Sequence, residues 1–107
     1  MKRTLTAPEC LAHFFKTREK FNARAHNLLT LAKNAHCNFL GYRTSYCGIL
    51  LGILPERIAM TEFLLQHLDS IPGVLPIHRD YLECDLSHLI AYRDKAEEYM
   101  KKPNVYS

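Results

Sequence analysis

Two pairs of metal-ligating residues stand about one helical turn apart in the sequence. Cys10 precedes His13 by three residues, and Cys84 precedes His88 by four. Either spacing places both side chains on one side of a helix, and thiolate and imidazole are ligands that suit zinc. One hypothesis is therefore a small zinc-stabilised helical domain whose first and last helices share a metal. The pattern lacks the short ligand spacing of specific zinc motifs, and core positions explain the same residues, so we expect no metal.

The same cysteines and histidines do not form a recognisable catalytic motif. Cys84 and His88 could pair a thiol with a base, and His36 next to Cys37 is a second such pair, but neither has an orienting acid beside it. The sequence contains no glycine-rich phosphate loop, no GxSxG motif and no HExxH motif. We expect a protein that is not an enzyme and has no cofactor.

Length and composition limit the architecture and the compartment. The 107 residues are 48% hydrophobic and 23% charged, which suits a single domain over residues 1–107 and excludes disorder. The basic start Met1-Lys2-Arg3 is not followed by the apolar run of a signal peptide, and the most apolar stretch, 47–54, is too short to cross a bilayer. We expect a cytoplasmic protein without membrane contact, in which most of the four cysteines are buried or partly buried thiols.

The first helix has a clear start. Thr6 can cap it, Pro8 suits its first turn, and Glu9 stands three residues after Thr6, as a capping box requires. No glycine and no further proline occurs before Ala35. The sequence therefore predicts one long helix up to about that residue.

Glycines and prolines divide the rest of the chain. They predict a second, shorter helix over roughly 37–52, and a third that opens with Pro55 at its favoured first position and runs to about residue 68. A loop over 70–78 and a last helix over 79–102 follow. Because nothing alternates as a strand does, the predicted fold class is all-α: a single-domain bundle of about four helices, long at both ends and shorter in the centre.

The third predicted helix is apolar nearly all round. Its apolar side chains are Ile58, Leu65 and Leu68 on one face and Met60, Phe63 and Leu64 on the other. Such a helix is either central in a bundle or buried by another chain. A small bundle encloses few positions completely, so the second explanation is preferred and predicts a subunit or partner interface.

Two arginines fall among apolar residues. Arg18 lies in the apolar stripe of the first helix and Arg93 in that of the last. A buried guanidinium needs a carboxylate, and Asp85, at the edge of the last helix's apolar face, is the obvious candidate. The alternative is that each stem packs while its charged head reaches water.

A second hypothesis for function is DNA binding. The region 48–68 resembles part of a helix-turn-helix motif, on the evidence of Gly48, Leu51-Gly52-Ile53, Pro55 and Ile58. A recognition helix needs polar side chains toward the groove, and only Arg57, Thr61 and Gln66 are suitable. The alternative is a close helix crossing that glycine permits.

Charge is distributed unevenly along the chain. Residues 1–50 hold eight lysines and arginines against two glutamates, whereas the rest holds six bases against nine acids, so a basic face can steer an acidic partner or two helices can attract each other. The leading prediction is a small regulatory or adaptor protein that binds another protein stoichiometrically, as a homodimer. The expected partner-binding residues are Met60, Phe63 and Leu64 for apolar contact, Lys16, Lys20 and Arg24 for steering, and Tyr92 and Tyr99 on a tyrosine-rich flank of the last helix.

Overall fold

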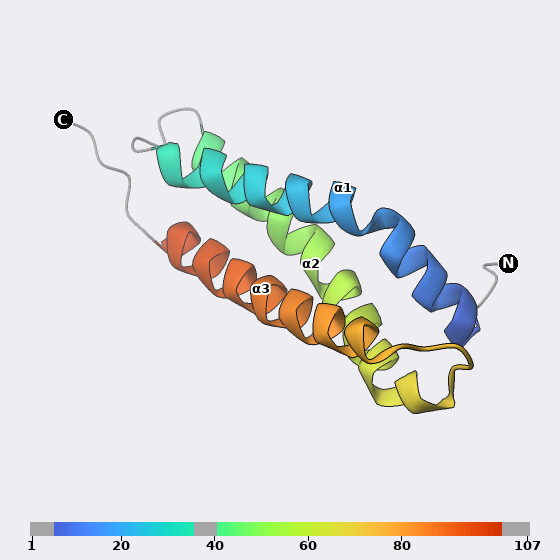
Figure 1. Cartoon of the computed structure of the whole chain (residues 1–107). Coiled ribbons are helices and arrows are strands. Elements are labelled where there is room, and N and C mark those ends of the chain that lie inside the picture. Colours follow the sequence, from blue (N-terminus) through green and yellow to red (C-terminus); the bar gives the residue numbers. More distant parts are fainter. Residues whose placement is uncertain (1–5, 36–40, 102–107) are drawn as a thin grey trace, which may run out of the picture.

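Three long helices make up the fold (Figure 1). The computed structural model describes residues 6–35 and 41–101, and no strand occurs in that part of the chain. The helices are α1 (Ala7–Asn34), α2 (Tyr42–His67) and α3 (Pro76–Lys101), and the short 3-10 helix η1 (Leu68–Ser70) follows α2 directly. The all-α class is confirmed, but the expected count of four helices is wrong because the two central helices are one.

α2 continues through Pro55, where the sequence predicted a new helix to begin. A proline inside a helix lacks the N–H that would bond the carbonyl of Leu51, and its ring crowds that carbonyl, at a cost of about 3 kcal/mol. Pro55 lies on the exposed side of α2, whereas Leu54 and Ile58 next to it are buried. We infer that burying the apolar side chains on both sides of the proline stabilises the continuous helix by more than the proline destabilises it.

The ends of the other helices follow local signals. Thr6 caps α1: its Oγ1 accepts a hydrogen bond from the Glu9 N–H at 3.3 Å, and its own N–H donates to the Glu9 carboxylate at 3.3 Å, which confirms the capping box. α2 begins after Gly41, whose φ of 73° favours glycine; the expected start at residue 37 lies outside the described residues. α3 begins at Pro76, three residues earlier than predicted, because proline suits a first helical position.

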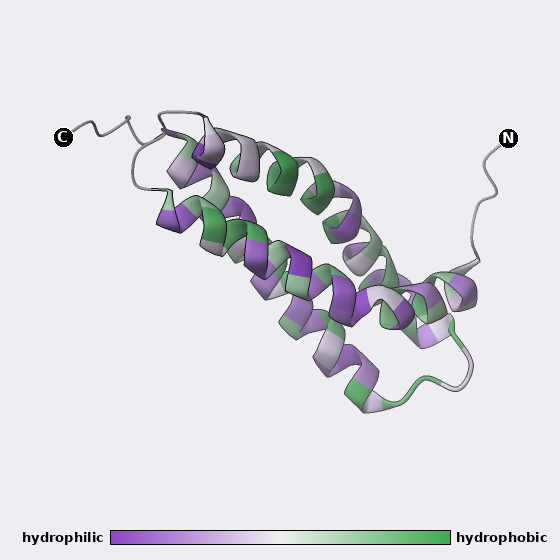
Figure 2. Cartoon of the chain, turned by 90° about the horizontal axis from the view of Figure 1, so that it is seen from above, coloured by the Kyte–Doolittle hydropathy of each residue, from purple (hydrophilic) through white to green (hydrophobic). Residues whose placement is uncertain are grey.

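α2 is the central helix of the bundle. It packs against both α1 and α3, which touch each other less. The molecule is long and thin, with extents of 57 × 33 × 19 Å. Figure 2 shows hydrophobic and hydrophilic residues alternating along the helices, as expected for helices with one face in a core.

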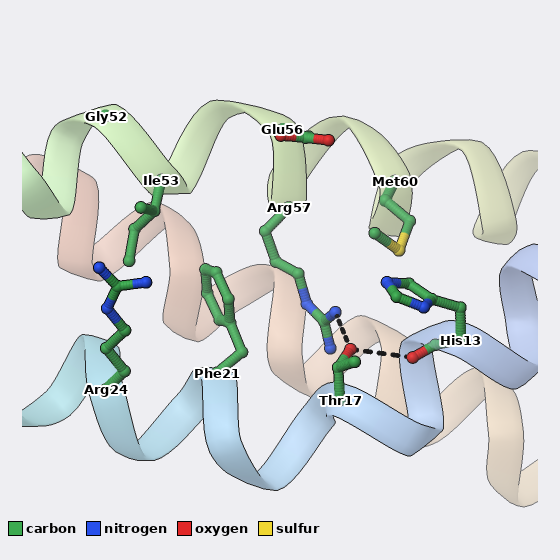
Figure 3. A pocket seen from close by; sticks show the side chains of 9 residues that line it. All are labelled: His13, Thr17, Phe21, Arg24, Gly52, Ile53, Glu56, Arg57 and Met60. Atoms are coloured by element: carbon green, nitrogen blue, oxygen red, sulfur yellow. Dashed lines mark hydrogen bonds between the residues drawn. The ribbon is translucent and has the colours of Figure 1, made fainter. Parts of the chain in front are cut away.

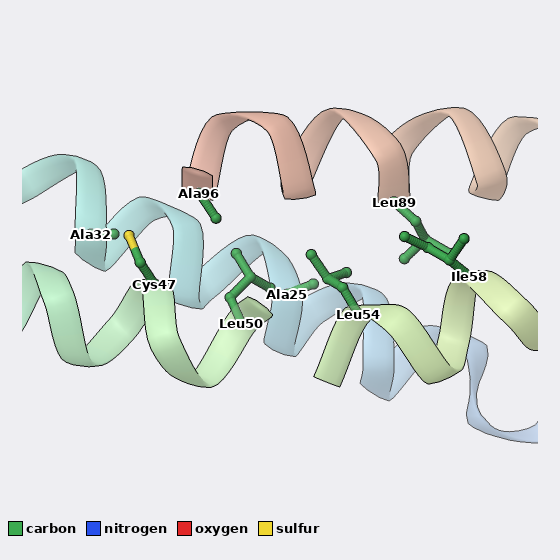
Figure 4. Close-up of a cluster of buried hydrophobic side chains, with 8 residues drawn as sticks. All are labelled: Ala25, Ala32, Cys47, Leu50, Leu54, Ile58, Leu89 and Ala96. Carbon is green, nitrogen blue, oxygen red and sulfur yellow. The ribbon is translucent and has the colours of Figure 1, made fainter. Parts of the chain in front are cut away.

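The buried apolar side chains form two clusters along the bundle. The small-residue cluster consists of Ala25, Ala32, Cys47, Leu50, Leu54, Ile58, Leu89 and Ala96 (Figure 4). The large-residue cluster consists of Cys10, Phe14, Leu64, Leu68, Ile71 and Leu82. The first lies toward the end of the bundle where α1 ends and α2 begins, and the second lies around η1.

No helix among the described residues combines the length and the hydropathy needed to cross a bilayer.

Candidate functional site

A polar layer lies between the two clusters, and its first component joins α1 to α3. Arg18 Nε donates to Asp85 Oδ2 at 2.7 Å, and Arg18 Nη2 donates to Asp85 Oδ1 at 2.9 Å. Asp85 is only 2% exposed, whereas Arg18 reaches the surface beside the ring of Tyr81. The hydrogen bonds that Arg18 donates to the carboxylate raise the pKa of Arg18. The predicted partnership of Arg18 with Asp85 is confirmed, while the half-exposed Arg93 contacts Asp94 instead.

The second component of the polar layer is Arg57 of α2, which is 4% exposed. Its Nη1 donates to Thr17 Oγ1 at 2.7 Å, and its Nη2 donates to the Phe14 carbonyl at 2.9 Å. The guanidinium carbon lies 4.1 Å from the centre of the Phe14 ring and 5.0 Å from that of Phe21. Its Nε has no hydrogen-bond partner among the described residues.

Burial and nearby charges act in opposite directions on Arg57. Removal from water lowers its pKa, and the positive charge of Arg18 acts in the same direction, whereas the negative charge of Asp85 raises it. Both oxygens of Asp85 are already bonded to Arg18. The carboxylate therefore helps Arg57 only across space, and the direct partners of Arg57 are neutral.

Arg57 also lines a pocket between α1 and α2 (Figure 3). The pocket has a volume of about 360 Å³, within the range of small-molecule sites. It is lined by His13, Thr17, Phe21 and Arg24 of α1 and by Gly52, Ile53, Glu56, Arg57 and Met60 of α2. Figure 3 shows Arg57 reaching from α2 to Thr17 in the middle, with Arg24, Phe21 and Ile53 to one side and His13 and Met60 to the other. The cavity thus has charged and apolar walls.

Five predicted partner-binding residues lie in or beside this pocket. Arg24 and Met60 line it. Lys16 and Lys20 are exposed and precede Arg24 by eight and four residues, so the three cations form one row along α1. Phe63, 40% exposed, follows Met60 by three residues on α2. We call the pocket together with Lys16, Lys20 and Phe63 the α1–α2 groove.

The other predicted partner-binding residues lie elsewhere. Leu64 is completely buried in the large-residue cluster and is a core residue, although the preceding residue, Phe63, is exposed. Tyr92 and Tyr99 are half-buried on α3, where they pack against the small-residue cluster. The structure therefore brings only part of the predicted set together.

The helix-turn-helix resemblance fails on the geometry of α2. Residues 48–67 belong to one helix, so this segment contains no turn between two helices. Arg57 and Thr61, which the resemblance required on the surface, are both buried, and the Thr61 hydroxyl donates to the Arg57 carbonyl at 2.8 Å. Only Gln66 of the three expected contact residues is exposed.

The proposed zinc ligands do not meet. Among the described residues, one group of candidate ligand atoms lies close together, within 4.8 Å, and it comprises Cys84, Asp85 and His88. Cys10 is buried in the large-residue cluster, and His13 lines the pocket between α1 and α2. Since Arg18 already holds both oxygens of Asp85, the group is better explained as the surface edge of that ion pair.

The described thiols are free, and two of the three are buried. Burial raises the pKa of Cys10 and of Cys47, which makes both poor nucleophiles at neutral pH, whereas Cys84 is exposed. Its Sγ lies 4.0 Å from His88 Nδ1. The other pair considered for catalysis, His36 and Cys37, lies outside the described residues.

Comparison with known proteins adds no relative: no protein family model, no curated protein and no solved structure matches the chain.

Proposed function

We propose that this protein is a small non-enzymatic binding protein that associates stoichiometrically with an acidic segment of another protein along the α1–α2 groove. The observation that carries the proposal is a row of exposed cations on α1 facing apolar side chains on α2 across a pocket. Lys16, Lys20 and Arg24 form the first edge, and Met60 and Phe63 contribute to the second.

The charges of this row are available to a partner. Lys16, Lys20 and Arg24 form no ion pair with any residue in the described part of the chain. Exposed charges of one sign attract a partner of the opposite sign over about a Debye length and raise the rate of association. The apolar edge then provides the contact area that holds the complex, to which Phe and Met are well suited.

The first experiment measures binding of a fluorescently labelled acidic amphipathic helical peptide by anisotropy. We expect saturable binding that weakens as salt is added, and at least tenfold weaker binding for the variant Lys16→Glu/Lys20→Glu/Arg24→Glu. The matched control, Arg79→Glu/Arg93→Glu/Lys95→Glu, changes the net charge equally but on α3 and should bind nearly as the wild type does. Equal loss in both variants, or equal affinity for a peptide with lysines in place of glutamates, contradicts the proposal.

A second variant tests the apolar edge. Phe63→Asp should weaken peptide binding while the circular dichroism of the helices is retained, because Phe63 is 40% exposed. Leu75→Asp, in the loop before α3, is the control, since Leu75 is 59% exposed and lies outside the groove. Unfolding of the Phe63→Asp variant would show instead that this side chain belongs to the core.

The predicted homodimer stays a prediction. Native mass spectrometry of protein purified without chelator distinguishes a monomer from a dimer and reports any bound metal in the same spectrum. Duplex DNA, titrated at low salt in the anisotropy experiment, tests the alternative partner: binding that equals that of the acidic peptide would assign the row of cations to phosphates instead.

A further inference from the structure

The α1–α2 groove contains a buried cation whose bonding capacity is only partly used. A guanidinium has five N–H donors. Two of those of Arg57 are accounted for, by the hydroxyl of Thr17 and the carbonyl of Phe14, and its Nε has no partner among the described residues. Burying a charge without a counter-charge is costly, so a native protein usually supplies one.

The charges around Arg57 do not balance. Three arginines, Arg18, Arg24 and Arg57, lie in the polar layer and the pocket, together with two carboxylates, Glu56 and Asp85. Asp85 is held by Arg18 through both oxygens. The arginines therefore outnumber the carboxylates, and the exposed Lys16 and Lys20 add positive charge beside a pocket that is open to solvent and large enough for a small organic group.

We propose that this pocket is a carboxylate-binding site. The carboxylate lies against the guanidinium group of Arg57, with which it forms charge-assisted hydrogen bonds, and the carbon skeleton lies against Phe21, Ile53 and Met60. Arg24, on the other side of the Phe21 ring in Figure 3, adds a second positive charge to the same pocket. The apolar wall of Phe21, Ile53 and Met60 favours an organic carboxylate over inorganic phosphate, which has no carbon skeleton to place there. The carboxylate belongs either to a free organic acid or to an acidic side chain of the protein segment proposed above, and in the second case the inference rests on that proposed function.

The test uses phenylacetate as the probe and phenylacetamide, its uncharged counterpart of nearly the same shape, as the control. In two-dimensional NMR titrations we expect saturable shifts of the amides around Phe21, Ile53 and Arg57 with phenylacetate, and at least tenfold weaker binding of the amide. Equal binding of both compounds overturns the proposal, because the carboxylate would then contribute nothing. Tighter binding of inorganic phosphate than of phenylacetate overturns the assignment to carboxylates.

The variant Arg57→Met removes the charge and keeps much of the side-chain volume. We expect loss of phenylacetate binding together with a melting temperature that is unchanged or higher, since a buried charge has been replaced by an apolar group. Arg93→Met, which removes an arginine from the surface of α3, should change neither binding nor melting. If Arg57→Met does not fold, Arg24→Met at the exposed end of the pocket takes its place, and unchanged phenylacetate binding in the folded variant contradicts the proposal.

A competition experiment separates the two sources of the carboxylate. If an acidic side chain of the partner occupies the pocket, the peptide displaces phenylacetate, and replacing one glutamate of the peptide by glutamine abolishes the displacement. If a free acid occupies it, peptide and phenylacetate bind together. A peptide that does not bind at all refutes the proposed function, whereas the carboxylate site is still decided by phenylacetate against phenylacetamide.

Discussion

The two core clusters on either side of the polar layer are built from different side chains. Three alanines and a cysteine stand among the eight residues of the small-residue cluster, whereas the large-residue cluster is made of leucine, isoleucine and phenylalanine with a single cysteine. Close packing leaves little free volume in either. Opposite changes should therefore destabilise the two clusters most: shorter side chains in the large-residue cluster, and longer side chains in the small-residue cluster.

Truncation in the large-residue cluster should have the largest effect. Phe14 is completely buried and also supplies the ring on which Arg57 stacks. We expect Phe14→Ala to lower the free energy of unfolding by about 4 kcal/mol, measured by urea denaturation, because it removes buried area and leaves a cavity. Phe63→Ala makes the same chemical change at an exposed position and should have a much smaller effect. Similar losses for the two variants would mean that Phe14 is not part of a tightly packed core.

Removing the negative charge of Asp85, between the two clusters, should have the second largest effect on stability. Asp85→Asn leaves Arg18 and the buried Arg57 without a negative charge in the polar layer. We expect a loss of about 3 kcal/mol in the free energy of unfolding, because removing one member of a buried ion pair leaves the other with an uncompensated charge. Asp80→Asn, at an exposed position of α3, is the control.

The double variant Asp85→Asn/Arg57→Met tests whether Asp85 stabilises Arg57 as well as Arg18. If the carboxylate serves both arginines, part of the loss should be recovered when Arg57 is also removed, and the two changes should not add. Strict additivity would show that Asp85 stabilises Arg18 alone.

Enlargement in the small-residue cluster should have the smallest effect of the three. Ala25 of α1 is completely buried, so Ala25→Leu forces the surrounding helices to shift and should cost about 2 kcal/mol. Ala23→Leu, on the exposed side of the same helix, is the matched control. An Ala25→Leu variant as stable as the wild type would reveal free space in this cluster and remove the contrast between the two halves.

The sequence predicted the features that depend on neighbouring residues. The capping box joins Thr6 to Glu9 over three positions, and the length of α1 follows from the absence of breakers. The pairing of Arg18 with Asp85 was also predictable, although the two lie 67 positions apart, because each stood in or beside an apolar stripe.

The wrong predictions for α2 all follow from placing a helix boundary at Pro55. Leu50, Leu54, Arg57, Thr61, Leu64 and Leu68 follow one another at alternating intervals of four and three, and all are buried. This is the spacing of a single core-facing stripe, and it runs straight through Pro55. Treating Pro55 as a boundary hid the stripe, so Arg57 and Thr61 were placed on the surface and Leu64 on an interface.

The pocket could not have been predicted from the sequence alone. Its centre depends on a hydrogen bond from Arg57 to the Phe14 carbonyl, across 43 positions of the chain. This pairing depends on how far α1 and α2 are displaced along their axes, which local sequence patterns do not encode.

The thinness of the molecule has a kinetic consequence. Its shortest extent, 19 Å, is about two helix diameters, so the space between α1 and α2 is never more than one helix away from water. A molecule held there can leave without any lid or domain having to open. Its residence time is then set by its own contacts, and the fold favours rapid exchange between occupied and empty states.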